Sequence, residues 1–262
     1  MKKIVCLGNC QFGQLHYLLS HLLSRNEYET SCFSNNARSG NLQETRVILK
    51  AIREADILIY QPLGRDHGEL SQINIQQGVK STCRCIAMEY AFNSGVYSLC
   101  HAPFHTDHGY GKIFGEEFIL ELAREKTGDA ILEDYKNGVI DFKLHARFDE
   151  CALQMEEREE RSHADILLAD FIRNNYRHEK LFHTHNHPTN ALFAEIFRQL
   201  IRLTSLPVRL SGLKKLKELD GIRSPVSPYD VTVHGYAFGP SADWLEKGNK
   251  LISLILRENR LS

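Results

Sequence analysis

The stretch MKKIVCLGNCQF, residues 1–12, decides the first element of the fold and carries most of the chemistry of the chain. Residues 4–7 form a short apolar run typical of a buried strand, and Gly8 and Asn9 interrupt it. Leucines then recur at helical spacing between positions 15 and 23. The pattern predicts a strand, a tight turn and a helix, with Cys10 at the start of the helix.

Cys10 is a candidate nucleophile because of this position. The positive end of the helix dipole and the unpaired backbone N–H groups of the first turn both favour a thiolate. The same N–H groups can hold an oxyanion. We therefore expect a reactive cysteine at position 10.

The composition excludes several classes of protein. The chain has 262 residues, is 42% hydrophobic and carries a net charge of −1, so no basic field indicates a nucleic-acid partner. No apolar stretch approaches the ~20 residues that span a bilayer. The apolar run after Met1 is shorter than the core of a signal peptide, and an odd number of cysteines, seven, fits a reducing compartment. We therefore expect a cytoplasmic protein.

The first half of the chain alternates strand and helix patterns, which predicts an α/β fold with a parallel sheet flanked by helices. Further strands are expected at 29–33, 56–60 and 84–88, with a weaker one at 97–100. We interpret residues 1–262 as one domain, in which 1–112 form a sheet-rich core and 113–262 a mainly helical C-terminal elaboration. The helical patterns after residue 113 lie at 116–126, 130–136, 148–176, 188–203 and 242–257.

A second informative segment is FHTHNHPTN, residues 182–190. It follows a predicted late strand at 180–183 and precedes a helix, with Pro188 suited to the first helical turn. Because the carboxyl ends of parallel strands share one edge of a sheet, we expect Cys10 and His187 to converge there. An imidazole beside a thiol is the minimum for thiol nucleophilic catalysis.

These two segments resemble those of a known family. Gly8-Asn9-Cys10-Gln11 and Asn186-His187-Pro188-Thr189 are similar to motifs of the WcbI-type capsular polysaccharide biosynthesis family, which resembles the flavodoxin-like fold of SGNH (GDSL-like) hydrolases. In that comparison Cys10 replaces the hydrolase serine, and His187 matches its base. The resemblance implies an acyltransferase, with acetyl-CoA as co-substrate and a sugar or capsular polysaccharide as acceptor. Transfer could pass through an acyl-Cys10 or go directly to a hydroxyl that His187 deprotonates.

The chain departs from the hydrolase pattern at two places. Thr184 stands where the hydrolases carry an aspartate, so Asp66, Asp107 or a backbone carbonyl would have to orient His187. The hydrolase Gly-x-Asn-Asp block is absent, and Gln61, after the strand at 56–60, is our side-chain candidate for holding the oxyanion. The other candidates for the oxyanion site are Gly8, Asn9, Gln11 and Gly40.

Coenzyme A recognition would need cations for its phosphates. The candidates for these contacts are Arg38, Arg65, Arg84 and Asn186. No glycine-rich phosphate loop of the P-loop or Rossmann type occurs, so coenzyme A is expected from the resemblance alone.

Three other functions remain open at this point. Cys10 and His187 could instead catalyse hydrolysis in an SGNH-like esterase or thioesterase. His183, His185 and His187, or the histidines at 101–108, could instead hold a metal ion for hydrolysis, although we expect no metal. The chain could also be a sugar- or CoA-binding protein without catalysis. A homo-oligomer is compatible with each of these functions.

Overall fold

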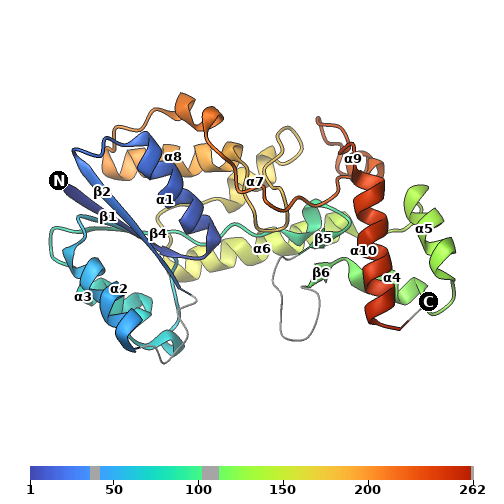
Figure 1. Ribbon diagram of the computed structural model, residues 1–262, viewed down its shortest axis with the longest axis horizontal. Helices are drawn as coiled ribbons and strands as arrows, with labels where there is room; N and C mark the ends of the chain where they lie inside the picture. Colours follow the sequence, from blue (N-terminus) through green and yellow to red (C-terminus); the bar gives the residue numbers. More distant parts are fainter. Residues whose placement is uncertain (36–41, 102–111, 261–262) are drawn as a thin grey trace. The chain divides into compact units, whose positions relative to one another are not determined.

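The computed structural model describes residues 1–35, 42–101 and 112–260, and it confirms an α/β fold with a four-stranded parallel sheet flanked by helices (Figure 1). The chain divides into two compact units. The first comprises Met1–Ala91, Met155–Phe171 and Asn190–Leu219, and the second the remaining segments. The assignment of 1–262 to a single domain stays a prediction.

The strands are β1 (Lys2–Gly8), β2 (Tyr28–Ser34), β3 (Ile57–Tyr60), β4 (Arg84–Ala87), β5 (Cys100–His101) and β6 (Ile113–Phe114). The α-helices are α1 (Cys10–Leu22), α2 (Leu42–Glu54), α3 (Gln72–Gly78), α4 (Glu116–Leu122), α5 (Gly128–Lys136), α6 (Leu144–Ser162), α7 (Ala169–Asn175), α8 (Asn190–Thr204), α9 (Pro228–His234) and α10 (Trp244–Glu258). Short 3₁₀ helices occur at η1 (Arg65–Leu70), η2 (Ser94–Val96) and η3 (Leu210–Lys215).

The sheet of the first unit has the strand order β2-β1-β3-β4, and all pairs are parallel. This is the flavodoxin-like order, in which the direction of sheet growth reverses between β1 and β3. Side chains alternate across β1, so Val5 and Leu7 join the apolar cluster beneath α2 and α3 while their neighbours face the opposite side. Figure 1 shows α1 and α8 on that opposite side. In sheets of this order, ligands bind outside the carboxyl ends of the two strands at the reversal, which here are β1 and β3.

The turn between β1 and α1 is held by its own residues. Asn9 is the N-cap of α1, and its side-chain oxygen accepts a hydrogen bond from the backbone N–H of Gln11. Its carbonyl oxygen accepts the N–H groups of Phe12 and Gly13. Gly8 is required because a Cβ there would lie 2.1 Å from the ring of Phe12, a side chain with no exposed surface. The helix therefore starts at Cys10, as predicted.

The second unit is built mainly from helices around one apolar core. Ile119 of α4, Ile131 of α5 and Ile252 of α10 belong to this core. A buried carboxylate ties the unit together: Asp230, in the capping box of α9, accepts hydrogen bonds from the backbone N–H and hydroxyl of Ser98 and from the N–H of Ser227. The second unit thus has an apolar core of its own.

The predicted late strand at 180–183 is wrong. These residues fold back on the segment that follows them, through an isolated antiparallel bridge between Phe182 and Pro188. The N–H of His183 donates to the carbonyl of His187 at 2.7 Å, and the N–H of Thr189 donates to that of Leu181 at 2.9 Å. Because this local pairing uses the backbone groups that a sheet would need, the segment forms a closed turn.

The predicted helix over 148–176 is interrupted. His163 adopts a left-handed φ of 51°, which ends α6 at Ser162, and α7 begins only at Ala169. Between them, Asp165 accepts the N–H of Ala87 through its carboxylate, and Ile166 forms a parallel bridge with Met88. Flavodoxin-like sheets continue with a further strand beside β4. Here the connection between α6 and α7 lies beside the end of β4 instead. The weaker strand expected at 97–100 also shifts, to β5 at Cys100–His101, which pairs antiparallel with β6.

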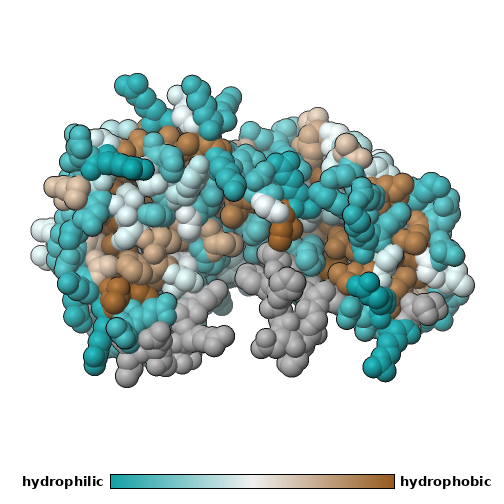
Figure 2. All heavy atoms as spheres, viewed as in Figure 1, coloured by the Kyte–Doolittle hydropathy of each residue, from teal (hydrophilic) through white to brown (hydrophobic). Residues whose placement is uncertain are grey.

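The surface is mixed. Figure 2 shows hydrophilic residues over much of one face, with apolar residues gathered in smaller patches. Large apolar side chains that remain exposed include Val47, Val139 and Leu153. No helix in the described part of the chain is long and apolar enough to cross a bilayer.

The close contact at Gly8 gives a testable prediction. We expect Gly8→Ala to lower the free energy of unfolding by about 1–3 kcal/mol, because the added methyl group overpacks the buried Phe12 ring. Gly13→Ala, on the helix that carries Phe12 and with open space at its Cβ position, should instead raise it by about 0.5–1 kcal/mol. Urea denaturation of the two variants checks this, and an equal effect of both would contradict the packing argument.

Candidate active site

Cys10 lies at the carboxyl end of β1, at the point where the order of the sheet reverses. The register pairs Gly8 with Ser34 of β2, and Leu7 with Tyr60 of β3. Asn35 and Gln61 are therefore the first residues past the neighbouring strands, and both stand beside the β1–α1 turn. Open α/β sheets place their binding sites at this position.

The Cys10 thiol is less acidic than its place on the helix predicts. The residue is exposed, yet the protein around the sulfur desolvates it and raises the pKa of the thiol above its ordinary value. Hydrogen bonds from the backbone N–H groups of Gln11 and of Cys10 itself lower this pKa, but they do not outweigh the desolvation. The expectation of a stabilised thiolate is thus wrong for the isolated cysteine, and nucleophilic attack needs a base.

Gln11 is occupied by a structural role. Its side-chain amide pairs with the backbone of Ala91 in both directions: Nε2 donates to the carbonyl at 2.7 Å, and Oε1 accepts the N–H at 2.9 Å. The backbone N–H of Gln11 donates to Asn9. Gln11 therefore anchors the segment after β4 against the first turn of α1, and its side chain is not placed as an oxyanion donor.

Of the remaining oxyanion candidates, Asn9 and Gly8 have structural roles, whereas Gln61 is placed as a possible donor. The cap uses the side-chain oxygen of Asn9, so Asn9 shapes the turn, and Gly8 admits the Phe12 ring. The N–H of Cys10 lies in the first turn of α1, where backbone N–H groups have no intrahelical acceptor, and it donates to the residue's own sulfur, so it remains a candidate donor to an oxyanion formed there. Gln61 keeps its place at the carboxyl end of β3, with its backbone N–H on the carbonyl of Leu7.

Asn35 is a residue of this edge whose side chain the sequence pattern did not single out. It is 9% exposed, its N–H donates to the carbonyl of Gly8, and its Nδ2 donates to Oε1 of Gln61 at 2.9 Å. Its position directly after a strand was the only available signal. The pair joins the strands on either side of β1.

Glu89 and Tyr90 follow β4 at the same edge. Burial raises the pKa of the Glu89 carboxyl, and the hydroxyl of Ser162 and the charge of Arg158 oppose that rise. The Arg158 guanidinium lies 4.6 Å from the centre of the Tyr90 ring. These residues add a buried acid and an aromatic ring to the edge, and the sequence pattern indicated neither.

His187 lies in the closed turn at 182–188, within the second unit. It is 8% exposed, and its Nδ1 is buried without a hydrogen-bond partner in the described part of the chain. Burial lowers the pKa of His187, and the neighbouring His183 lowers it further. The imidazole is therefore neutral at ordinary pH, which is the state that a base requires.

The late-strand argument no longer brings His187 to Cys10, because residues 180–183 are not part of the sheet. Thr184 does not replace the missing aspartate, since its hydroxyl bonds Asn186 within the turn. Asp66 lies exposed in η1, and Asp107 is outside the described residues. The Cys10–His187 pair thus stays a prediction.

The coenzyme A candidates are scattered. Arg65 is exposed in η1, after the carboxyl end of β3. Arg84 begins β4 at the level of Ile4, so four residue steps of strand, about 13 Å, separate it from the carboxyl end of β1 at Gly8. Asn186 lies in the histidine turn, and Arg38 and Gly40 fall outside the described residues. The sheet thus brings no arginine of this set to the thiol among the described residues.

Metal ligands do not gather in the described part of the chain: no three His, Cys, Asp or Glu side chains there are arranged to hold an ion. His183 and His185 are buried in the turn, where burial lowers the pKa of His185 to about 3. His105, Asp107 and His108 are outside the described residues.

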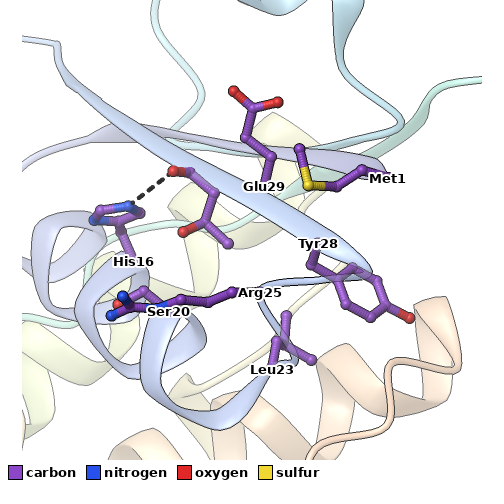
Figure 3. Close-up of a pocket in the computed structure, with 8 residues that line it drawn as sticks. Met1, His16, Ser20, Leu23, Arg25, Tyr28 and Glu29 are labelled. Atoms are coloured by element: carbon purple, nitrogen blue, oxygen red, sulfur yellow. Dashed lines mark hydrogen bonds between the residues drawn. The ribbon is translucent and has the colours of Figure 1, made fainter.

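A cavity of about 440 Å³ opens at the opposite edge of the sheet, against the C-terminal half of α1 (Figure 3). His16 bonds the carbonyl of Thr30 there at 3.3 Å. Arg25, Tyr28 and Glu29 point in different directions in Figure 3, so these polar groups do not converge on one point. The cavity lies at the amino ends of β1 and β2 and is not part of the Cys10 site.

The family model for "Polysaccharide biosynthesis enzyme WcbI" matches residues 3–209. The chain belongs to the WcbI family. This match confirms the family resemblance that the two motifs indicate. The chain is therefore an enzyme, of a family whose members are described as polysaccharide biosynthesis enzymes. No curated protein matches the chain.

A solved structure of WcbI shows the same fold. It matches with a TM-score of 0.72 at 18% identity, over 99% of this chain and 95% of that chain. That WcbI is described as a novel polysaccharide biosynthesis enzyme. The structure is of the native protein, without a disulfide bond between coenzyme A and one of its cysteines. The WcbI fold therefore extends over the whole chain.

The raised pKa of Cys10 predicts slow alkylation at neutral pH. Because the thiolate is the reacting form, iodoacetamide labelling of Cys10 should still be increasing at pH values where a free thiol of ordinary pKa, ~8.5, is fully reactive. Peptide mass spectrometry of Cys10, with glutathione as the reference thiol, measures this. A labelling rate that levels off below pH 8 would contradict it.

Proposed function

We propose that this WcbI-family enzyme is an acyltransferase that moves an acetyl group from acetyl-CoA through Cys10 to a hydroxyl of a sugar or polysaccharide. The observation that carries the proposal is the exposed Cys10 thiol at the switch point of the sheet, at the start of a capped helix. A thiol there meets both a substrate crevice and the N–H donors that stabilise a tetrahedral oxyanion.

The first half-reaction forms acetyl-Cys10. The Cys10 sulfur attacks the thioester carbon of acetyl-CoA as His187 takes the thiol proton. The carbon–sulfur bond to coenzyme A then breaks, and His187 returns the proton to the departing sulfur. The N–H of Cys10 and the side chain of Gln61 hold the oxyanion in between.

The second half-reaction delivers the acetyl group. A sugar hydroxyl attacks the acetyl-Cys10 carbonyl while His187 removes the hydroxyl proton. The bond to sulfur breaks, and the proton passes from His187 to the sulfur, which restores the enzyme. Acetyl-CoA and free cysteines both fit a cytoplasmic site for this reaction.

The pKa shifts support a neutral thiol working with a neutral imidazole. Burial raises the pKa of Cys10 and lowers that of His187, so both are uncharged over a wide range around neutral pH. A proton then moves from sulfur to nitrogen only during attack. This is the arrangement of a general base, and it differs from a preformed thiolate–imidazolium pair.

The solved WcbI structure supports the proposed use of coenzyme A. Its description names a disulfide bond between coenzyme A and one of its cysteines, which that native form lacks. A cysteine that can reach the coenzyme A sulfur has the geometry that acyl transfer from coenzyme A to a thiol needs. We propose that Cys10 has this role here.

Intact-protein mass after incubation with acetyl-CoA tests the proposal. We expect an increase of about 42 Da, the mass of one acetyl group replacing a proton, and its loss in Cys10→Ala. His187→Ala should slow acetylation by about 10²–10⁴-fold, the usual contribution of a general base. Cys83→Ala, which changes another cysteine of the chain, is the matched control and should acetylate normally.

The pH profile follows from the same shifts. Acetylation by this route starts from a neutral Cys10 thiol and a neutral His187, so its rate should be level from below pH 6.5, where His187 loses its proton, to above the ordinary thiol pKa. A rate that rises only with thiolate formation would argue against His187 as the base. The absence of any Cys10 adduct would overturn the covalent route.

A further inference from the structure

Asn35 and Gln61 form a bridge across the end of β1. Each is anchored to that strand through its backbone: the N–H of Asn35 donates to the carbonyl of Gly8 at 3.1 Å, and the N–H of Gln61 donates to that of Leu7 at 2.8 Å. Their side chains then meet, with Asn35 Nδ2 donating to Gln61 Oε1 at 2.9 Å. Adjacent strands lie about 4.8 Å apart, so the bridge stands within side-chain reach of the Cys10 turn.

The direction of this hydrogen bond decides which end of Gln61 is presented. A carboxamide has an acceptor oxygen and a donor nitrogen on opposite sides of one carbon. Because Asn35 engages Oε1, the end of Gln61 that remains for a ligand is Nε2. In the reverse hydrogen bond, Gln61 Nε2 would donate to Asn35 Oδ1. Gln61 would then present its oxygen, which cannot donate and would repel an oxyanion.

The bridge is made at a cost, since Oδ1 of Asn35 is buried and has no hydrogen-bond partner among the described residues. Buried polar atoms are normally paired, and an exception needs an explanation. A requirement to hold Gln61 in one orientation supplies it: Asn35 uses its donor on Gln61 while its own acceptor stays unpaired.

We infer that Asn35 is a positioning residue, which holds the Gln61 carboxamide so that Nε2 donates to the acyl oxygen on Cys10. This inference rests on the proposed acetyl transfer and adds a residue that acts through Gln61. Asn35 itself touches neither the thiol nor the acetyl group in this mechanism. Its effect is confined to the tetrahedral intermediates, which carry the oxyanion.

Asn35→Asp tests the direction of the bond with almost no change of shape. An ionised Asp at position 35 can only accept, so it would pair with Gln61 Nε2 and turn Oε1 toward the oxyanion. Removal of one oxyanion donor typically lowers a rate by about 10²–10³-fold. We expect Asn35→Asp and Gln61→Ala each to slow single-turnover acetylation of Cys10 by that factor, and the double variant to be no slower than Gln61→Ala.

The pH profile separates positioning from a structural role. When the introduced carboxyl is protonated it can donate to Gln61 Oε1, as Asn35 does. Relative to the unaltered chain, the acetylation rate of Asn35→Asp should therefore recover as pH falls, and this recovery should disappear in the Gln61→Ala background. Asn35→Ala, which leaves Gln61 free to take either orientation, should lose less activity than Asn35→Asp and show no such recovery.

Thermal unfolding and calorimetric binding of coenzyme A serve as controls: Asn35→Asp should unfold cooperatively, at a lower temperature because its carboxylate is buried, and should bind coenzyme A nearly as the unaltered chain does. Additive losses in the double variant, or equal losses in Asn35→Asp and Asn35→Ala at every pH, would overturn the positioning role alone. If the unaltered chain acetylates Cys10 and Asn35→Asp does so equally fast, the inference also fails while the proposed function stands. A lack of acetylation in the unaltered chain overturns both.

Discussion

The cap that Asn9 places on α1 is the constraint on which the candidate site depends. By accepting the N–H groups of the first turn with its side chain and its carbonyl, Asn9 stops β1 and starts the helix within one residue. Cys10 is thereby held at the carboxyl edge, between the residues that follow β2 and β3. The absence of a side chain at Gly8 is part of the same arrangement, since the Phe12 ring occupies the space where a Cβ would lie.

Desolvation is the electrostatic effect that decides the state of both candidate catalytic groups. At Cys10 it outweighs two backbone N–H groups and keeps the thiol protonated, and at His187 it keeps the imidazole neutral. A helix N-terminus alone contributes too little to overcome the loss of water around a sulfur atom. The chemistry then depends on a transfer of the proton during attack, which fits a reaction whose charge develops only in the transition state.

The sequence predicted the parallel sheet and its surroundings because apolar runs and helical spacing are local signals. Residues 2–8, 28–34 and 57–60 form strands close to the expected bounds, and α1 begins at the expected cysteine. The late strand failed because residues 181–189 pair with one another, a choice that periodicity cannot reveal. The break after Ser162 was equally hidden, since it depends on the left-handed φ of His163 and on pairing with the end of β4.

The sequence by itself determined the identity of the candidate nucleophile, the helix that carries it and the family, because each is written in a short contiguous motif. Tertiary structure alone decided the protonation state of Cys10, the use of Gln11 as an anchor for Ala91 and the pairing of Asn35 with Gln61. The last two join residues 80 and 26 positions apart, and burial depends on everything packed around a group. Contacts of that kind arise only when the strands take their order in the sheet.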